Sequence, residues 1–172
     1  MKKVIDKVGW IGRTLFLMTD ILTFKKEPYQ WLSNMQYVKI EYDGIIYPSI
    51  ENFYQAMKYG KSAVVFLDHT PQRQHIRTYL SKLKPHESKK FSREHDMSNG
   101  RFEDNKFKIM LFALQQKFNQ EPFKTLLLNT GDCHIEEGNW WGDHFWGVDI
   151  KTRQGENNLG KLIMQVRSEL RG

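Results

Sequence analysis

The sequence contains a single cysteine, Cys133, so it can form neither an intramolecular disulfide nor a cysteine-based metal cluster. Such scarcity is typical of proteins from a reducing compartment. The chain starts Met1-Lys2-Lys3, but the longest apolar run that follows, Leu15–Met18, is far too short for a signal-peptide core or a membrane span. We therefore expect a cytoplasmic protein that has no membrane partner.

Several common active-site motifs are also missing. The segment Gly155–Gly160 lacks the second glycine of a Rossmann fingerprint, and no Walker A sequence occurs. The six histidines include no His-x-x-x-His pair, and no Gly-x-Ser-x-Gly elbow is present. Cys133 beside His134 is more simply a small buried cysteine at the start of a strand than a catalytic dyad. We expect no metal and no cofactor.

The chain is rich in positive charge and in aromatic residues. Lysine and arginine number 26 against 20 acidic residues, a formal charge of +6, which favours an anionic partner such as a nucleotide, a phosphorylated metabolite or nucleic acid. The hydrophobic share of 40% is that of a globular chain. A length of 172 residues without repeat or linker predicts one domain over residues 1–172.

The hydrophobic pattern predicts an α+β fold that is mostly helical, with a small antiparallel element near the N-terminal third. The clearest strands flank Asp43-Gly44, a favoured hairpin turn. The expected strands are 15–18, 21–24, 38–42, 45–47 and 133–136. Helices are expected at 49–58, 62–67 and 104–119. Three further helices are expected: one capped by Thr70-Pro71 that ends before Pro85, one from Pro122 to Gly131, and a last one capped by Asn157 or Asn158.

The predicted helix Ser49–Lys58 carries polar residues at regular spacing. Ser49 is a suitable N-cap, and the apolar stripe comprises Ile50, Phe53, Tyr54 and Met57. Glu51, Gln55 and Lys58 fall on the opposite face. The helix dipole favours any acid in the first turn, so Glu51 has a structural explanation. The alternative is a site in which this face lines a cleft.

Two other segments allow both a structural and a functional explanation. The loop 136–147 gathers acids and tryptophans, whose rings either fill the core or stack on a flat ligand, and glycines at 142 and 147 allow close backbone approach. The basic run contains Lys82, Lys84, Lys89, Lys90 and Arg93. It is either a solvated face or a phosphate site, and a partly buried lysine there could become a nucleophile.

Taken in order, short motifs from Trp31 to Arg167 resemble the NADAR superfamily, the YbiA-like N-glycosidases. They are W-L-S-N at 31–34, S-I-E-N-F-Y-Q-A-M-K at 49–58, K-P-H-E-S-K-K-F-S-R at 84–93, N-T-G-D at 129–132, I-E at 135–136, D-H-F-W-G at 143–147, G-E-N-N-L-G at 155–160 and L-I-M-Q-V-R at 162–167. Each motif is weak alone, but the ordered set is specific.

The resemblance implies a mostly helical α+β fold and cleavage of the C–N glycosidic bond of ribosylated compounds, either riboflavin-pathway intermediates or ADP-ribosylated guanine. The implied partner is a phosphorylated ribose or ADP-ribose ligand, carried by DNA in one case. The family motifs place catalytic roles on Glu51, Lys89 and Asp143, and substrate-binding roles on Trp31, Asn34, Gln55, Arg93, Glu136, Trp146 and Asn157. No metal is needed.

The sequence also departs from the family pattern. Met35, Asn52 and Ser92 stand where the family usually has Phe, His and Gly, and Arg101-Phe102 stands in place of a typical Asp-Trp pair. These changes keep open a second interpretation, a module that binds ADP-ribose or a modified nucleotide without cleaving it. Residues 1–20 have no family counterpart.

Overall fold

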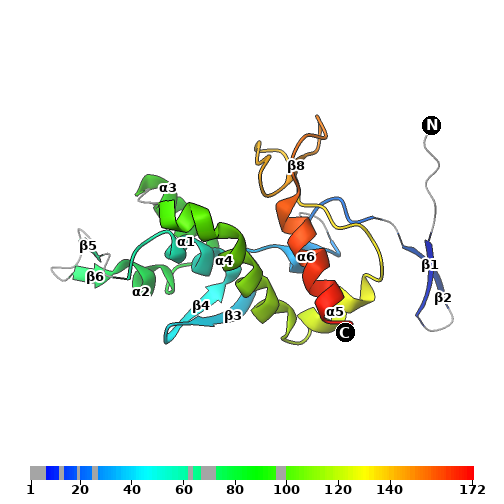
Figure 1. Cartoon of the computed structure of the whole chain (residues 1–172), viewed down its shortest axis with the longest axis horizontal. Helices are drawn as coiled ribbons and strands as arrows, with labels where there is room; N and C mark the ends of the chain where they lie inside the picture. Colours follow the sequence, from blue (N-terminus) through cyan, green and yellow to red (C-terminus); the bar gives the residue numbers. More distant parts are fainter. Residues whose placement is uncertain are drawn as a thin grey trace. The chain divides into compact units, whose positions relative to one another are not determined.

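The computed structural model describes residues 7–11, 14–18, 20–24, 27–61, 64–66, 73–95 and 100–172 (Figure 1). Its contacts divide the chain into two compact units. The terminal unit comprises Met1–Leu32 and Gln120–Gly172, and the central unit comprises Ser33–Asn119. Both are built from helices with small two-stranded sheets, so the mostly helical α+β prediction is confirmed. No helix within the described ranges is long and apolar enough to cross a membrane.

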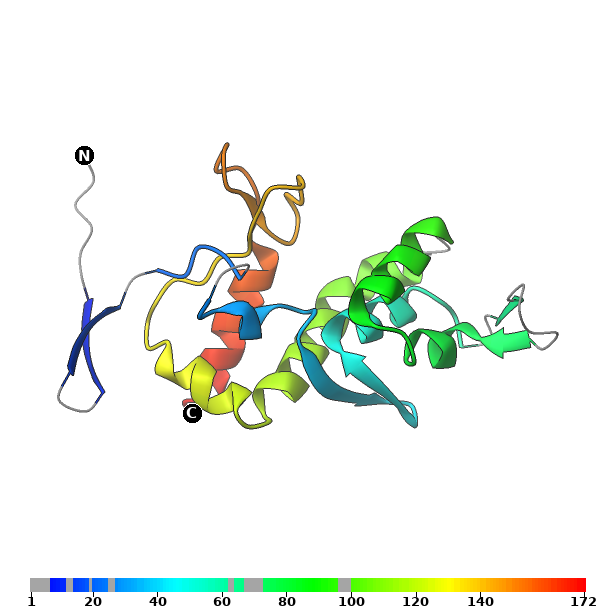
Figure 2. The same ribbon diagram turned by 180° about the vertical axis from the view of Figure 1, so that it is seen from behind.

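The central unit begins with an antiparallel hairpin and then becomes helical (Figure 2). Its elements are β3 (Tyr37–Tyr42), β4 (Ile45–Ser49), α1 (Ile50–Met57), β5 (Val64–Phe66), β6 (Arg73–His75), α2 (Ile76–Leu80), α3 (Pro85–Glu94) and α4 (Gly100–Phe118). The predicted hairpin is confirmed, because Asp43 and Gly44 have φ angles of 55° and 74° between the paired residues Tyr42 and Ile45. Both central turn residues of such a tight hairpin need positive φ.

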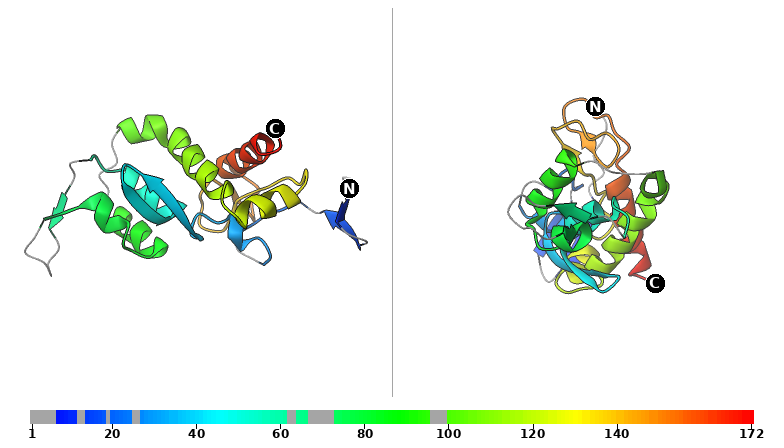
Figure 3. Two further views of the ribbon diagram at one scale, coloured as in Figure 1. Left: turned by 90° about the horizontal axis from the view of Figure 1, so that it is seen from below. Right: turned by 90° about the vertical axis from the view of Figure 1, so that its left-hand side faces the viewer.

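Helix α1 is the centre of this unit. It contacts α2, α3, α4 and both strands of the hairpin, elements that lie around it in Figure 3. The residues from Ile50 to Ala56 are all buried. The predicted N-cap is confirmed: the backbone N–H of Asn52 donates to Oγ of Ser49 at 3.1 Å. Because α1 is covered on nearly every side, its polar residues are buried together with its apolar ones.

Two predictions for the segment after α1 are wrong, and a third differs only in where its helix begins. The helix expected at 62–67 is the strand β5, which pairs with β6; Val64 and Val65 are β-branched and favour that pairing. The next helix begins at Ile76, because Arg73–His75 is used as a strand, and its expected cap Thr70-Pro71 lies outside the described residues. The long helix expected at 104–119 is confirmed as α4, which begins earlier, at Gly100, and ends at Phe118.

The terminal unit consists of β1 (Lys7–Ile11), β2 (Thr14–Met18), the short 3-10 helix η1 (Gln30–Leu32), α5 (Phe123–Asn129), β7 (Gly138–Asn139), β8 (Val148–Asp149) and α6 (Asn158–Glu169). Helix α5 lies beside the C-terminal end of α6 (Figures 1 and 2), where Arg167 Nη1 donates to Thr130 Oγ1 at 2.8 Å. The predicted strand at 15–18 lies within β2, and Gly131, with φ of 54°, follows α5 as expected.

The strands predicted at 21–24 and 133–136 are reduced to a single parallel bridge between Ile21 and Ile135. Two backbone bonds make it, from Ile21 N to His134 O at 2.8 Å and from Glu136 N to Ile21 O at 2.7 Å. Beyond this bridge the two segments are joined by a side-chain bond, from Thr23 Oγ1 to Gly138 O at 3.2 Å. The prediction of two full strands is therefore wrong.

Candidate functional site

Glu51 is a buried carboxylate in the first turn of α1, with 7% of its surface exposed. Its Oε1 accepts a hydrogen bond from Gln55 Nε2 at 2.8 Å, and its backbone N–H donates to Asn34 O at 3.0 Å. Within the described residues no cation pairs with it. Buried charges in proteins are normally paired or bound to a ligand. The helix dipole and one neutral hydrogen bond are the partners that this carboxylate has here.

Two predicted ligand-binding amides near Glu51 have unused acceptors. Oε1 of Gln55 and Oδ1 of Asn34 are buried and accept no hydrogen bond from any residue that the structure describes. Gln55 is only 5% exposed, and Asn34 Nδ2 reaches Met110 Sδ at 3.6 Å, a weak contact. Buried polar atoms of this kind usually find a partner.

On helix α3 the predicted site residues Lys89 and Arg93 each directly follow a buried serine. Ser88 and Ser92 are buried, and neither hydroxyl has a hydrogen-bond partner among the described residues. Lys89 follows Ser88 and is half-buried, whereas Arg93 is exposed. Neither cation is paired with another residue in the described part of the chain. Helix α3 packs on α1, which carries Glu51. The two buried serines and the two cations, Lys89 and Arg93, therefore belong to a direct neighbour of the Glu51 helix.

Sequence reasoning missed Lys117, which is fully buried at the end of α4. Its Nζ donates to Ser33 O at 2.9 Å and lies 5.3 Å from the centre of the Phe118 ring. Since Asn34 O accepts from the Glu51 amide, Lys117 fixes the segment that touches Glu51. A single lysine in an amphipathic helix resembles a surface residue, so only the tertiary contact could have identified it.

Asn52, one of the departures from the family pattern, links α1 to the end of α2 and to the chain that follows it. Its Nδ2 donates to Leu80 O at 2.8 Å and to Leu83 O at 2.9 Å, and its side chain is completely buried. Lys58, predicted to share the Glu51 face, places its ammonium 5.9 Å from the centre of the Phe102 ring.

In the terminal unit, Asp143 organises the tryptophan-rich loop. Its Oδ1 accepts from the backbone N–H groups of Phe145 at 3.2 Å and Trp146 at 2.8 Å. The Phe145 and Trp146 rings meet edge to face with centres 5.0 Å apart. Asn139 bonds the Asp143 backbone through both its side-chain atoms. The second oxygen, Oδ2, forms no hydrogen bond to a residue that the structure describes, so Asp143 has one oxygen available for chemistry.

The glycines of this loop differ in purpose. Gly147 permits close approach, because an added Cβ would lie 2.3 Å from Glu137 O, as the sequence predicted. Gly142 has open space around it, but its φ angle of 77° lies in the left-handed region, which other residues rarely adopt. Glycine is therefore favoured there by the backbone conformation and not by lack of space. Trp140 and Trp141 are 52% and 50% exposed, which shows that these two rings do not fill the core.

Glu136 and Asn157 already have strong partners. Arg153 binds both carboxylate oxygens of Glu136, at 2.7 and 2.9 Å, and Glu136 is 5% exposed. The Asn157 side chain accepts from Glu137 N and donates to Ile135 O at 3.0 Å. Asn157 precedes α6 in a left-handed conformation, with φ of 53°, and its side chain makes no capping bond. Both residues hold the 135–137 segment in place.

The ten predicted site residues divide evenly between the units. Asn34, Glu51, Gln55, Lys89 and Arg93 belong to the central unit; Trp31, Glu136, Asp143, Trp146 and Asn157 belong to the terminal unit. Direct bonding joins Glu51 to Gln55 and to the Asn34 backbone. It also joins Asp143 to the Trp146 backbone. Trp31 lies half-buried in η1.

Two further groups bear on the chemistry. Burial raises the pKa of the half-buried Cys133 thiol, which disfavours the thiolate that a nucleophile requires. Across the described ranges, no group of three or more His, Cys, Asp or Glu side chains is placed to hold a metal ion.

Comparison with known proteins identifies a family. The sequence profile of the NADAR domain matches residues 23–171. The N-glycosidase YbiA of Escherichia coli (strain K12) is 31% identical over 150 residues, which cover 84% of this chain and 83% of YbiA. The N-glycosidase Npun_R5314 of Nostoc punctiforme is 30% identical over 84% of this chain and 88% of its own length.

Structure and longer relatives agree with this match. The NMR structure of E. coli YbiA superposes with a TM-score of 0.68 at 27% identity, covering 90% of this chain and 87% of that one. The riboflavin biosynthesis protein VVA0006 of Vibrio vulnificus is 32% identical over 149 residues. The chain spans only 36% of that protein's length, and 21% of a maize chloroplast riboflavin biosynthesis protein.

Proposed function

The chain belongs to the NADAR family, and on that basis we propose that it is an N-glycosidase that hydrolyses the C–N glycosidic bond of a phosphorylated ribose conjugate. The relatives that match over most of their length are named N-glycosidases. We further infer one functional domain over residues 1–172, and a cytoplasmic location, which the single cysteine favours.

The observation that carries the proposal is the buried, cation-free carboxylate of Glu51, held by Gln55. When a glycosidic C–N bond breaks, positive charge develops on the ribose ring. A fixed carboxylate stabilises that charge most strongly where water is excluded. A cation already paired with Glu51 would cancel this effect, and the central unit supplies none among its described residues.

In the proposed reaction the bond between C1′ and the base nitrogen breaks, water supplies hydroxide to C1′, and a proton goes to the departing nitrogen. Glu51 stabilises the sugar cation. From the family motifs we infer that Asp143 is the second acid, which orients or deprotonates the water, and that the Trp146 ring stacks on the base. The Asp143 contacts described above lie within the terminal unit. Asn34 and Gln55 accept hydrogen bonds from the ribose hydroxyls, and Arg93 binds the phosphate.

Lys89 offers an alternative route. Its amine attacks C1′ of the ring-opened ribose, the bond from C1′ to the base nitrogen breaks as that nitrogen takes up a proton, and a Schiff base between C1′ and Lys89 remains. Water then hydrolyses the Schiff base, which releases the ribose aldehyde and regenerates the amine. The residue is half-buried and unpaired among the described residues, as a nucleophilic amine requires. Both routes release the same products, so they are distinguished by trapping the intermediate.

The substrate test uses two compounds that the proposal names: DNA carrying ADP-ribosylated guanine, and early riboflavin-pathway intermediates. Incubation with purified protein should release ADP-ribose from the first or ribose phosphate from the second, detected by mass spectrometry. Tight binding of both without any product would overturn the proposal.

That result would favour the second candidate, a non-catalytic module that binds ADP-ribose or a modified nucleotide. Its specific support is Phe102, which replaces the family's tryptophan and is 4% exposed with its ring centre 5.2 Å from that of Tyr54. The neighbouring Arg101 is exposed where the family has an acid. Phe102 therefore packs in the interior of the central unit, and Arg101 adds a positive charge to its surface.

A further inference from the structure

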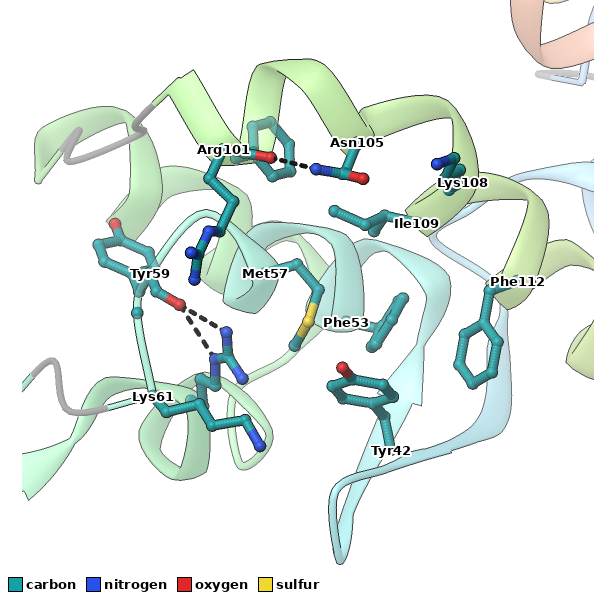
Figure 4. Close-up of a pocket in the computed structure, with 13 residues that line it drawn as sticks. Tyr42, Phe53, Met57, Tyr59, Lys61, Arg101, Asn105, Lys108, Ile109 and Phe112 are labelled. Atoms are coloured by element: carbon teal, nitrogen blue, oxygen red, sulfur yellow. Dashed lines mark hydrogen bonds between the residues drawn. The ribbon is translucent and has the colours of Figure 1, made fainter.

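The central unit contains a pocket of about 460 Å³ that none of the predicted site residues lines. It lies between α1, the hairpin turn region and α4 (Figure 4). Phe53 and Met57 contribute to it from α1. Phe53 follows Glu51 by two residues, which is about 200° round an α-helix. The pocket therefore opens on the other side of α1 from the Glu51 carboxylate.

Aromatic rings form the pocket's apolar walls. The rings of Tyr42, Phe53 and Phe112 meet pairwise with centres 5.6 Å apart, and Phe102 and Tyr59 also line it. Tyr42 and Phe112 remain 38% and 37% exposed despite these contacts. Large rings left open to solvent at a pocket edge are available to stack on a flat ligand.

The rim is positively charged. Among the described residues that line the pocket four are basic, Lys61, Arg77, Arg101 and Lys108, and none is acidic. Lys61 pairs with Asp43 at 2.9 Å, and Arg77 donates two bonds to Tyr59 O. Arg101 and Lys108 are exposed and make no ion pair with a described residue, and Figure 4 shows the Arg101 guanidinium directed toward Tyr59 and Met57. Such a rim attracts an anion.

From this combination we infer that the pocket is a second ligand site, which binds a nucleotide with its base against the aromatic walls and its phosphate at Arg101 and Lys108. Aromatic stacking with cationic neighbours is the usual physical basis of nucleotide binding without sequence preference. The volume lies within the range of small-molecule sites. The nucleotide is either free or part of a single strand. This binding is independent of cleavage at Glu51.

The test measures binding of three probes by titration calorimetry: adenosine 5′-monophosphate, a short single-stranded oligoadenylate DNA, and ribose 5-phosphate, which has no base. The double variant Arg101→Ala/Lys108→Ala should lower the affinity for the nucleotide probes at least about tenfold. Ribose 5-phosphate should bind at least about tenfold more weakly than the mononucleotide, because it cannot stack. Binding of the strand alone would identify a strand site; binding of both would identify a site for free nucleotides as well.

Two controls make the result specific. Lys161→Ala removes an exposed charge of α6 that does not line the pocket and should change affinity less than about twofold. Gly60 lines the pocket with open space around an added Cβ, so Gly60→Trp should block binding whereas Gly60→Ala should not. The inference is overturned if no nucleotide probe binds, or if Lys161→Ala weakens binding as much as the pocket variant. Loss of turnover in Glu51→Gln with unchanged nucleotide affinity separates this site from the catalytic proposal.

Discussion

The side-chain amide of Gln55 donates from Nε2 to Oε1 of Glu51 at 2.8 Å, one helical turn away. The other end of the same amide, Oε1, accepts nothing from the described residues. Gln55 therefore fixes the carboxylate and at the same time presents an acceptor. We treat it as a positioning residue for Glu51.

Gln55→Leu keeps the size of this buried side chain but removes both functions. Turnover should fall about tenfold, because the carboxylate loses its orientation. Steady-state kinetics distinguish this role from a packing role: Gln55→Glu should also lower kcat, since a second carboxylate would face the first. An unchanged kcat in Gln55→Leu, with only thermal stability reduced, would show that the hydrogen bond is structural.

Lys89 decides between the two chemical routes. If its amine forms a Schiff base, borohydride added during turnover should link the sugar covalently to the protein, and the linkage should be absent in Lys89→Arg. If Glu51 acts electrostatically, no adduct forms, and Lys89→Arg, which keeps the charge, retains most of the activity. Mass spectrometry of the intact protein reads out both outcomes. Lys90→Arg, at the exposed neighbouring position, is the matched control.

Asn52 should matter for stability. Asn52→Ala leaves the carbonyls of Leu80 and Leu83 without their buried donor and should lower the free energy of unfolding by about 2–4 kcal/mol. Urea denaturation measures this change. Asn105→Ala removes a single bond to Arg101 O on the surface of α4 and should cost less than about 1 kcal/mol. Equal losses in the two variants would contradict the assigned role of Asn52.

Tyr47 should make the fold sensitive to alkali. Burial raises the pKa of Tyr47 to about 12, and its hydroxyl has no hydrogen-bond partner among the described residues. In the unfolded chain a tyrosine ionises near pH 10, so the unfolded state loses its proton first. The stabilisation is complete below about pH 10 and is lost between about pH 10 and 12, by about 2–3 kcal/mol.

Tyr47→Phe tests this directly. Because the hydroxyl makes no hydrogen bond to a residue that the structure describes, the variant should be about as stable as the wild type at pH 7, and its stability should decline less between pH 9 and 11. Thermal unfolding followed at several pH values gives the comparison. Parallel declines in the two proteins would contradict the assignment.

Local chemistry predicted the elements whose signals are local. Asp43-Gly44 determined the hairpin, Ser49 the start of α1, and the spacing of Glu51 and Gln55 their shared face. The strand β5 was missed because a three-residue run gives no distinguishable period, and its partner β6 is equally short. Short apolar segments remain ambiguous between helix and strand for this reason.

The site shows the same limit. The ordered motifs correctly predicted the family, and Glu51 is buried without a cation among the described residues. The Arg153 to Glu136 ion pair and the Lys117 to Ser33 bond join residues 17 and 84 positions apart, and nothing in the sequence near either partner indicates them. The aromatic pocket was missed because Tyr42, Phe53 and Phe112 come from three separate elements, and only tertiary contacts bring their rings together.

The most direct test of the central claim is the turnover of Glu51→Gln on whichever proposed substrate the wild type cleaves. The substitution keeps the shape of the side chain and removes its charge. Turnover should fall at least ~100-fold while circular dichroism and thermal unfolding show the fold intact. Turnover equal to that of the wild type would remove Glu51 from the mechanism and contradict the account.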